Sequence, residues 1–438
     1  MDAGNTAYVL GCAAMVMLMT PGLAFFYGGM VQAKSVLNMM MMSLVSLGVI
    51  GLIWVVFGFS LAFGDSHAGL IGGFEFVGLT QTGAMVNGVP VQAFAMFQLM
   101  FAVITGALVS GAIADRARFW PWTLFVAAWT VVVYIPLAHW IFAFDDAVSP
   151  NGGWLANTLG ALDFAGGTAV EINSGASALA LALVLGRRRG WPEPTRPHNL
   201  PAVLLGAGLL WFGWFGFNAG SALAAGATAA NAFVTTMTAA AASVMAWLVL
   251  EHRLDGRPTS LGGASAAIAG LVGITPACGY VDTWGALVIG VLAGLICQLA
   301  IRLKYRLGYD DSLDVVAIHG IGGVIGMLAL GFFATTSVNA DGADGLLYGG
   351  GVSQLGKQAL AVVVAMVWAF ALSAVLAWVI RKTIGFRAHA DDESAGIDEA
   401  EHAESAYEFT TMRTSGRSPG LTGQQRPARP HAREEESR

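Results

Sequence analysis

The chain has 438 residues, of which 56% are hydrophobic and only 11% are Asp, Glu, Lys or Arg. A soluble globular protein carries about 25% charged residues, so a soluble fold of this length could not cover its surface with polar groups. The formal net charge of −6 adds little, because an acidic stretch near the C-terminus supplies much of it. The composition therefore excludes a soluble globular protein and indicates a membrane protein.

Apolar runs that approach or reach the length of a membrane span recur along the chain. A hydrocarbon core of ~30 Å requires about 20 apolar residues in a helix. We therefore expect an all-α polytopic membrane protein with eleven transmembrane helices. The runs cover residues 7–30, 36–63, 91–114, 119–142, 163–185, 200–218, 229–250, 261–280, 283–303, 314–334 and 355–380.

Basic residues are concentrated in alternate loops. Lys and Arg follow the odd-numbered runs, whereas the other loops carry Asp and Glu and almost no base. The positive-inside rule makes the basic loops cytoplasmic, which predicts an N-terminus outside and a C-terminus inside. An odd number of helices requires the same orientation. The basic loops contain Lys34, Arg116, Arg118, Arg187–Arg189, Arg196, Arg253, Arg257, Arg302, Lys304, Arg306, Arg381, Lys382 and Arg387.

Two spans show a faint internal repeat. The fifth run opens with Leu162-Asp163 and carries Glu171, and the tenth opens with Leu313-Asp314 and carries His319. Five helices separate the two runs, so the halves would have opposite topology, as in the inverted repeats of many transporters. This pattern predicts two inverted five-helix repeats followed by a C-terminal helix.

The chain divides into three segments by composition. The apolar pattern stops near Gly385, residues 388–408 are acidic, and the final residues are rich in Arg, Ser, Pro and Gln, a composition typical of disorder. We expect a transmembrane domain over 1–385, a cytoplasmic regulatory segment over 386–411 and a disordered tail over 412–438.

Three ionisable residues lie within or at the ends of predicted spans. Such charges are costly in a bilayer, by ~2.5–3.5 kcal/mol on insertion scales, and are candidates for function. Asp163 stands at the start of its helix, where a carboxylate can cap free N–H groups or contact a ligand. Glu171 lies ~12 Å deeper at 1.5 Å per residue, and His319 lies at a similar place in its own span. Each could be a satisfied buried polar group, but two in matching positions favour a shared pathway.

Aromatic residues cluster in several spans. Most such residues pack in the core or form interfacial belts, but a few could face a vestibule and attract a small cation through their π faces, at ~0.5–2 kcal/mol each. Ser221 could add a hydroxyl acceptor. An enzyme is not expected, because no nucleophile, metal-ligand set or phosphate-binding loop accompanies these residues. The aromatic candidates are Phe97, Phe101, Trp140, Phe142, Trp211, Trp214, Phe215 and Phe217.

Several sequence motifs resemble those of the Amt/Mep/Rh ammonium transporter family. They appear in the family's order and span about residues 7–408. The resemblance implies eleven helices, a homotrimer with one pore per subunit, ammonium or ammonia as the substrate, and a plasma-membrane or inner-membrane location. It implies no cofactor, metal or nucleic-acid partner. The motifs are Pro21–Gly29, Leu162–Thr168, Pro197–Pro201, Trp214–Ser221, Gly270–Tyr280 and His319-Gly320.

The resemblance also assigns roles to individual residues. Phe101 and Phe217 match the stacked pair that gates the pore from outside. Phe101, Phe142, Ser221 and Asp163 match the outer ammonium-recruiting site, with Phe142 standing where the family commonly has Trp. Trp is the best π donor, so the cation–π contribution is expected to be weaker here.

The central pair of the pore departs from the family pattern. His319 matches one member of the family's histidine pair, but Val170-Glu171-Ile172-Asn173 replaces the usual Val-His-Ile-Asn, as in some fungal members. Burial raises the pKa of a carboxyl group and a nearby cation lowers it, so either protonation state of Glu171 is open. We hypothesise that Glu171 and His319 handle protons as one coupled pair, and that passage is electrogenic.

The acidic segment after the last helix resembles the family's cytoplasmic C-terminal segment, which predicts a PII-type signalling protein as a partner. The sequence leaves two alternatives to ammonium uptake open. One is an ammonium sensor of the same fold, although no output domain follows the last helix in the sequence. The other is a channel for neutral ammonia or carbon dioxide, against which Phe142, Ser221 and Asp163 favour recruitment of a cation.

Overall fold

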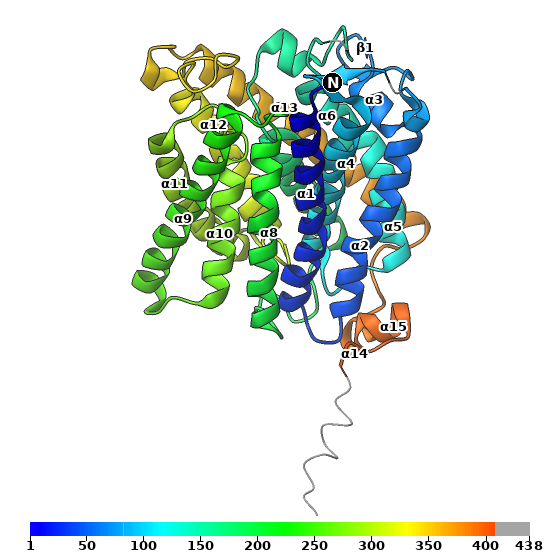
Figure 1. Cartoon of the computed structure of the whole chain (residues 1–438). Helices are drawn as coiled ribbons and strands as arrows, with labels where there is room; N and C mark the ends of the chain where they lie inside the picture. The colour runs from blue at the N-terminus through cyan, green and yellow to red at the C-terminus, as the bar shows by residue number, and fades with distance from the viewer. Residues whose placement is uncertain (82, 147, 408–438) are drawn as a thin grey trace, which may run out of the picture.

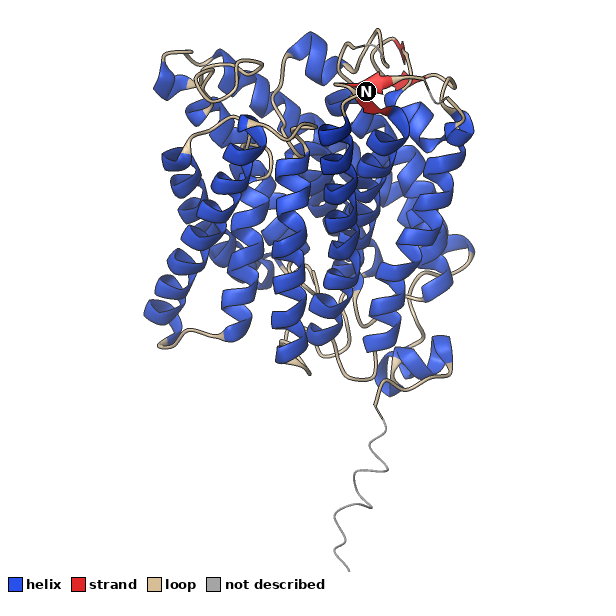
Figure 2. Cartoon of the chain, in the orientation of Figure 1, coloured by secondary structure: helices blue, strands red, loops and turns tan. Residues whose placement is uncertain are grey.

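The computed structural model describes residues 1–81, 83–146 and 148–407, so the predicted tail over 412–438 lies outside the described residues. The described chain is a bundle of helices (Figures 1 and 2). Its α-helices and strands are α1 (Ala3–Met30), α2 (Val36–Ile53), α3 (Phe59–Phe63), β1 (Ser66–His67), β2 (Ile71–Gly72), β3 (Met85–Val86), β4 (Val89–Pro90), α4 (Val91–Val109), α5 (Phe119–Trp129), α6 (Ile135–Phe142), α7 (Asn173–Leu185), α8 (Leu200–Gly220), α9 (Ala227–Asp255), α10 (Ser260–Ile274), α11 (Thr283–Leu307), α12 (Gly322–Phe333), α13 (Ser353–Thr383), α14 (Ala390–Ala395) and α15 (Ile397–His402).

Shorter helical turns interrupt or extend several of these helices. The π-helical turns are η1 (Trp54–Gly58), η4 (Thr130–Tyr134), η5 (Leu155–Leu159), η6 (Gly167–Ile172) and η7 (Val316–Ile321), and the 3₁₀ turns are η2 (Val77–Leu79), η3 (Ser110–Ile113) and η8 (Leu346–Tyr348).

Ten helices of the described chain are long and apolar enough to cross a membrane. They include continuous stretches such as Val36–Phe63 and Phe119–Phe142, in which a π-helical turn joins two α-helices. The expected run 261–280 forms only the 15-residue helix α10, because residues 275–281 leave the helix as a series of turns. The fold is thus a polytopic helical bundle.

The two ends of the bundle differ. The N-terminus and the short hairpins β1–β2 and β3–β4 lie at one end, which we call the amino-terminal face (Figure 2). Helices α14 and α15 lie at the opposite face (Figure 1). The described chain therefore starts and finishes on opposite sides of the bundle.

Helices α1 and α8 pack closely because small residues line their contact. A Cβ atom at Gly206 would lie 2.3 Å from the backbone nitrogen of Phe26, and one at Gly29 would lie 2.7 Å from the carbonyl oxygen of Asn199. Such close approach of backbones is how helices gain contact energy in a membrane, where burial of apolar surface adds little.

The internal repeat centres on η6 and η7, but its register differs from the predicted one. Glu171 and His319 are 148 residues apart, and the same separation relates Asp163 to Asp311 rather than to Asp314. Asp163 accepts a hydrogen bond from the Thr168 N–H, and Asp311 accepts one from the Val316 N–H at the same offset. The Leu-Asp pairs were therefore a wrong alignment, because Asp314 instead pairs with Lys304.

The two repeat helices cross where both have glycine. A Cβ atom at Gly175 would lie 2.2 Å from the Cα of Gly320, and one at Gly323 would lie 3.1 Å from the backbone nitrogen of Ile172. These two contacts are equivalent under the 148-residue offset. Only glycine allows the crossing helices to come this close.

The segment after α13 is held against the bundle by three carboxylates. Asp398 accepts hydrogen bonds from the N–H groups of Leu37 and Asn38 at the start of α2. Glu401 accepts one from the N–H of Phe119 at the start of α5, and Glu393 accepts one from the N–H of Arg189. Helix N-termini favour negative charge, so the acidic composition of this segment matches its docking positions.

The contact between α1 and α8 generates a first prediction. Gly206→Ala should lower the free energy of unfolding by about 1–3 kcal/mol, because its methyl group overlaps the backbone of α1. Thermal unfolding in detergent measures the change. Gly208→Ala is the matched control, since a Cβ atom there meets nothing within 4 Å. Equal melting temperatures for the two variants would contradict the packing argument.

Candidate functional site

A cavity of about 440 Å³ opens at the amino-terminal face. Its wall contains four carboxylate side chains together with aromatic and amide groups, and we call it the vestibule. The four acids come from three loops, two of them from adjacent positions in one loop, and together they give the mouth of the cavity a negative potential, which attracts cations. They are Asp145, Asp146, Asp163 and Asp341.

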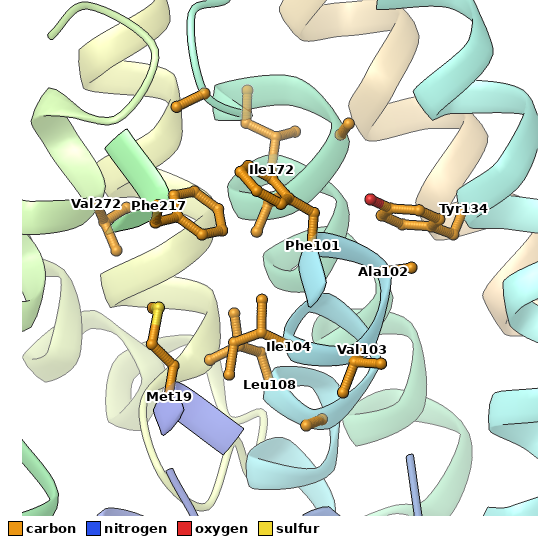
Figure 3. Packing of buried hydrophobic residues seen from close by; sticks show 14 of the residues in the cluster. Met19, Phe101, Ala102, Val103, Ile104, Leu108, Tyr134, Ile172, Phe217 and Val272 are labelled. Carbon is orange, nitrogen blue, oxygen red and sulfur yellow. The ribbon is translucent and has the colours of Figure 1, made fainter. Parts of the chain in front are cut away.

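Two stacked phenylalanines close the floor of the vestibule. The ring centroids of Phe101 and Phe217 are 4.0 Å apart with an interplanar angle of 17°, and both side chains are almost completely buried. Figure 3 shows the pair beside each other, above Met19 and Leu108 in that view. The structure thus brings together the two residues predicted to gate a pore.

Two further predicted residues border the same floor. Phe142 meets Phe101 edge-on, with centroids 6.4 Å apart and an angle of 82°. The Ser221 hydroxyl donates to the carbonyl oxygen of Phe217 at 2.9 Å. The hydroxyl proton of Ser221 is therefore already used, and its oxygen can accept a hydrogen bond from a cation in the vestibule.

Asp163 is a helix cap. Its Oδ1 accepts from the N–H groups of Gly166 and Gly167 at 2.8 and 2.6 Å, and its Oδ2 accepts from the N–H and the hydroxyl of Thr168 at 2.8 and 2.6 Å. These four bonds occupy the carboxylate, which is 4% exposed. The geometry therefore favours the capping interpretation, with Asp163 holding η6 in place and adding charge to the vestibule rim.

Gln98 was not predicted as a site residue. It lies one turn before Phe101 on α4 and lines the vestibule, and its Oε1 is buried with no hydrogen-bond partner among the described residues. An acceptor in that state can bind a donor that enters the cavity. The sequence did contain a signal for this site residue: Gln98 is an amide in an apolar span, three residues before the predicted gate residue Phe101.

Below the phenylalanine pair lies a small, narrow cavity, which we call the passage. Its volume is about 10 Å³, at the lower limit of the ~10–15 Å³ that one water molecule requires. Among the described residues, Glu171 and His319 are its two ionisable groups, and every other lining group is apolar apart from the indole N–H of Trp214. The remaining residues are Met19, Leu23, Phe26, Ile104, Leu108, Val170, Leu210, Phe217 and Ile268.

Glu171 and His319 meet at the helix crossing. The Nδ1 atom of His319 lies 2.7 Å from Oε2 of Glu171, and the two side chains are 4% and 0% exposed. Each residue sits in a π-helical turn, η6 or η7, a distortion often found at functional sites. The other carboxylate oxygen, Oε1 of Glu171, is buried and has no partner among the described residues.

The pair can hold or release one proton. When Glu171 is ionised, the hydrogen bond places a proton on Nδ1 of His319, and its Nε2 is either a lone pair or a second N–H. The pair then carries a charge of −1 or 0. The open Oε1 of Glu171 is an acceptor for a proton or for an N–H donor in the passage.

The chain matches the family model described as Ammonium Transporter Family over residues 7–407. The chain belongs to this family. An ammonium transporter of Mycobacterium tuberculosis is 50% identical over 446 residues, covering 96% of this chain and 94% of that protein. One from Bacillus subtilis is 45% identical, covering 93% and 99% of the two chains.

Solved structures share the fold. The crystal structure of Saccharomyces cerevisiae Mep2 superposes with a TM-score of 0.82 and is 37% identical, covering 89% of this chain and 88% of that chain. A structure titled "Sensor Amt Protein" superposes with a TM-score of 0.84 and is 32% identical, covering 91% and 98%. The predicted family is confirmed. The chain is a multi-pass protein of the cell membrane, from a family of transporters rather than enzymes.

The cap formed by Asp163 generates a second prediction. Asp163→Asn keeps one acceptor oxygen and should lower the free energy of unfolding by about 3 kcal/mol, since hydrogen bonds to a charged group contribute ~1.5–3 kcal/mol each. Thr168→Val, which removes one bond only, should cost about 1 kcal/mol. Thermal unfolding measures both.

Methylammonium uptake per folded molecule separates the two interpretations of Asp163. If Asp163 acts as a cap, both variants lose stability, while the apparent affinity of the folded protein for methylammonium changes little. A stable Asp163→Asn protein with strongly reduced affinity would instead identify a direct ligand.

Proposed function

We propose that this protein takes up ammonium across the cell membrane, by recruiting the cation in the vestibule and moving ammonia and a proton through the passage below it. The observation that carries the proposal is the acid–imidazole pair formed by Glu171 and His319, which contributes both ionisable groups of an otherwise apolar passage. Family membership supplies the substrate class.

Recruitment uses groups that suit a small cation with four N–H donors. Ser221 and Gln98 offer acceptor oxygens, and Phe101 and Phe142 offer π faces. The Phe at position 142 gives a weaker cation–π interaction than Trp would. The acceptor at Gln98 compensates for part of that difference.

Dehydration decides what enters the passage. An ammonium ion without its hydration shell costs tens of kcal/mol in a medium of ε ≈ 4 by the Born estimate, and less after relaxation. An ionised Glu171 at about 4 Å returns ~4 kcal/mol at an effective ε of 20. That attraction alters selectivity but does not make the passage freely permeable to cations.

Ammonium therefore gives up its proton before it passes. The N–H bond breaks at the phenylalanine floor, the lone pair stays on nitrogen, and neutral ammonia crosses the apolar passage. Oε1 of Glu171 takes up the proton, which neutralises the carboxylate while the Nδ1–H of His319 still donates to Oε2, and Oε1 then releases that proton toward the opposite face. One ammonia and one proton arrive together, so one positive charge crosses per cycle.

Charge movement makes accumulation possible. A membrane potential of ~100 mV is worth ~2.3 kcal/mol per charge, or almost fiftyfold accumulation. A channel for neutral ammonia gains nothing from the potential. Recordings on solid-supported membranes should therefore detect a current when ammonium is added, and its absence would exclude electrogenic passage.

The role of Glu171 generates a third prediction. Glu171→His removes the carboxylate and should reduce potassium permeation relative to ammonium by about tenfold, which takes only ~1.4 kcal/mol. The pH profile should shift as well, because two imidazoles titrate differently from an acid–imidazole pair. Vesicles containing the purified protein, assayed for both ions from pH 5 to 8, measure the effect.

Glu171→Gln is the matched control, since it keeps the size of the side chain and an acceptor for His319 but cannot bind or release a proton. We expect it to lose the current. An unchanged current and pH profile in both variants would show that Glu171 does not tune transport.

The acidic vestibule generates a fourth prediction. Asp341 lines the vestibule and is exposed. Asp341→Asn should weaken the apparent affinity for ammonium about twofold at low salt, and the difference should vanish above ~0.1 M salt, where the screening length falls to ~10 Å.

Glu75→Gln controls for net charge, because Glu75 is exposed at the same face outside the vestibule lining. An equal effect of the two substitutions, or one that persists at high salt, would contradict local attraction by the vestibule.

Topology and assembly complete the proposal. With α10 counted as a shorter span, the helices make eleven crossings in two inverted repeats and a final helix, the amino-terminal face is outside, and α14 and α15 are cytoplasmic. The pore domain covers 1–385, and a regulatory segment over 386–411 precedes the tail over 412–438. Three copies form a trimer, and a PII-type signalling protein docks at the cytoplasmic face.

A sensor is the second candidate, because one structural neighbour carries that title. A channel for neutral ammonia or carbon dioxide is the third. Electrical recording separates them from ammonium uptake: a sensor binds ammonium with little flux, and a gas channel passes flux without current.

A further inference from the structure

An apolar cleft of about 390 Å³ lies on the side of α7 and η7 that faces α13. It is distinct from the vestibule and from the passage, and we call it the rear cleft. Its lining consists of aliphatic, methionine and phenylalanine side chains and glycine backbone. Its lining includes Ile172, Gly175, Gly320, Val324 and Val367.

The rear cleft shares its wall with the passage. Glu171 lines the passage and the next residue, Ile172, lines the cleft. His319 lines the passage and the next residue, Gly320, lines the cleft. The two π-helical turns therefore carry Glu171 and His319 on the side of the passage and border the cleft on the other side.

The cleft lies at mid-membrane depth. Met366, Val367 and Phe370 border it and stand near the middle of α13, whose span covers Ser353–Thr383. On the same helix Val363 and Val367 are 54% and 61% exposed. The medium in contact with this surface is therefore hydrocarbon. An apolar cavity of this kind does not hold water stably.

The size of the cleft selects its occupant. One turn of an α-helix, 5.4 Å long and about 10 Å across, fills roughly 420 Å³. The cleft volume is comparable with one such turn, and a helix packed across the membrane would need several turns, so the shape favours a narrower occupant. A single unbranched hydrocarbon chain fits, because it is narrow and matches an all-apolar lining.

We propose that an acyl chain of a bilayer lipid occupies the rear cleft and supports the π-helical turns that carry Glu171 and His319. A chain in the cleft packs against Ile172 and against the backbone of Gly320, where glycine leaves the turn without a side chain of its own. The shape of the lipid tail thereby influences the geometry of the pair. The effect on transport rests on the function proposed above, but the occupancy of the cleft does not.

Occupancy is tested on the unmodified protein. The full chain is reconstituted in nanodiscs of phosphatidylglycerol and phosphatidylethanolamine with palmitoyl and oleoyl tails, and its structure is determined by cryo-electron microscopy. We expect tubular density between α7 and α13 that reaches Ile172 and Gly320. An empty cleft, or a cleft covered by a neighbouring subunit, overturns the proposal.

The influence on transport is tested with two valines of α13. Val367→Trp fills the cleft, and Val363→Trp, one turn earlier and outside the cleft lining, is the control. We expect Val367→Trp to lose the tubular density and to change the ammonium-evoked current at least threefold, while Val363→Trp retains both. Equal currents in the two variants refute the coupling.

The two proposals fail in different ways. If the unmodified protein gives no ammonium flux but shows the tubular density, the proposed function is wrong and the lipid site stands. If flux is present and the cleft is empty, the lipid site is wrong and the proposed function is untouched.

Discussion

Two ionisable side chains in a hydrocarbon environment must be held by helices whose backbones approach almost to contact. Gly175 allows this, because a Cβ atom there would lie 2.2 Å from the Cα of Gly320, and a Cβ atom at Gly320 would lie 3.3 Å from the Cα of Gly175. Their crossing brings η6 and η7 together, and the hydrogen bond between Glu171 and His319 follows from it. A membrane interior cannot hydrate a misplaced charge, so the partner must be in position whenever the charge is present. The vestibule above and the cleft behind are arranged around this one crossing.

The two repeats agree in backbone and differ in chemistry. Both use an aspartate, Asp163 or Asp311, to cap the turn that carries the central ionisable residue. The cap on the amino-terminal side borders an open cavity, whereas Asp311 is buried near Lys304, and burial raises the pKa of Asp311 to about 6. The 148-residue offset thus relates two similar scaffolds, on which acid and imidazole are placed opposite each other.

Hydropathy predicted most of the fold, since ten of the eleven expected spans appear as long apolar helices in the described chain. It overestimated the run at 261–280, because apolar composition alone does not distinguish helix from the tight turns that follow Ile274. The positions of Glu171 and His319 were evident as charges in apolar runs. Their pairing was predicted from their matching positions and from the family resemblance, because a separation of 148 residues leaves no local signal.

Other parts of the site depend on tertiary structure and could not have been predicted from residue types. The unpaired Oε1 of Gln98 is a property of what surrounds it, and the same amide on a lipid-facing surface would have no role. The register of the repeat was misjudged because Leu-Asp occurs in both halves, while the capping bond identifies Asp311. The rear cleft arises from glycines on two segments distant in sequence, neither of which indicates a cavity alone.

With Glu171 in place of one imidazole, a single proton sets the charge that the pair presents to the passage. Two neutral imidazoles present no charge to the passage, whereas the acid–imidazole pair carries −1 or 0 according to one proton. The passage has room for one water molecule at most, so hydration cannot substitute for that proton. A cation in the passage and a proton on the pair therefore oppose each other, and by linkage each weakens the other's binding by the same free energy. Under the function proposed above, a carboxylate at this position would link ammonium to protons by electrostatic competition alone.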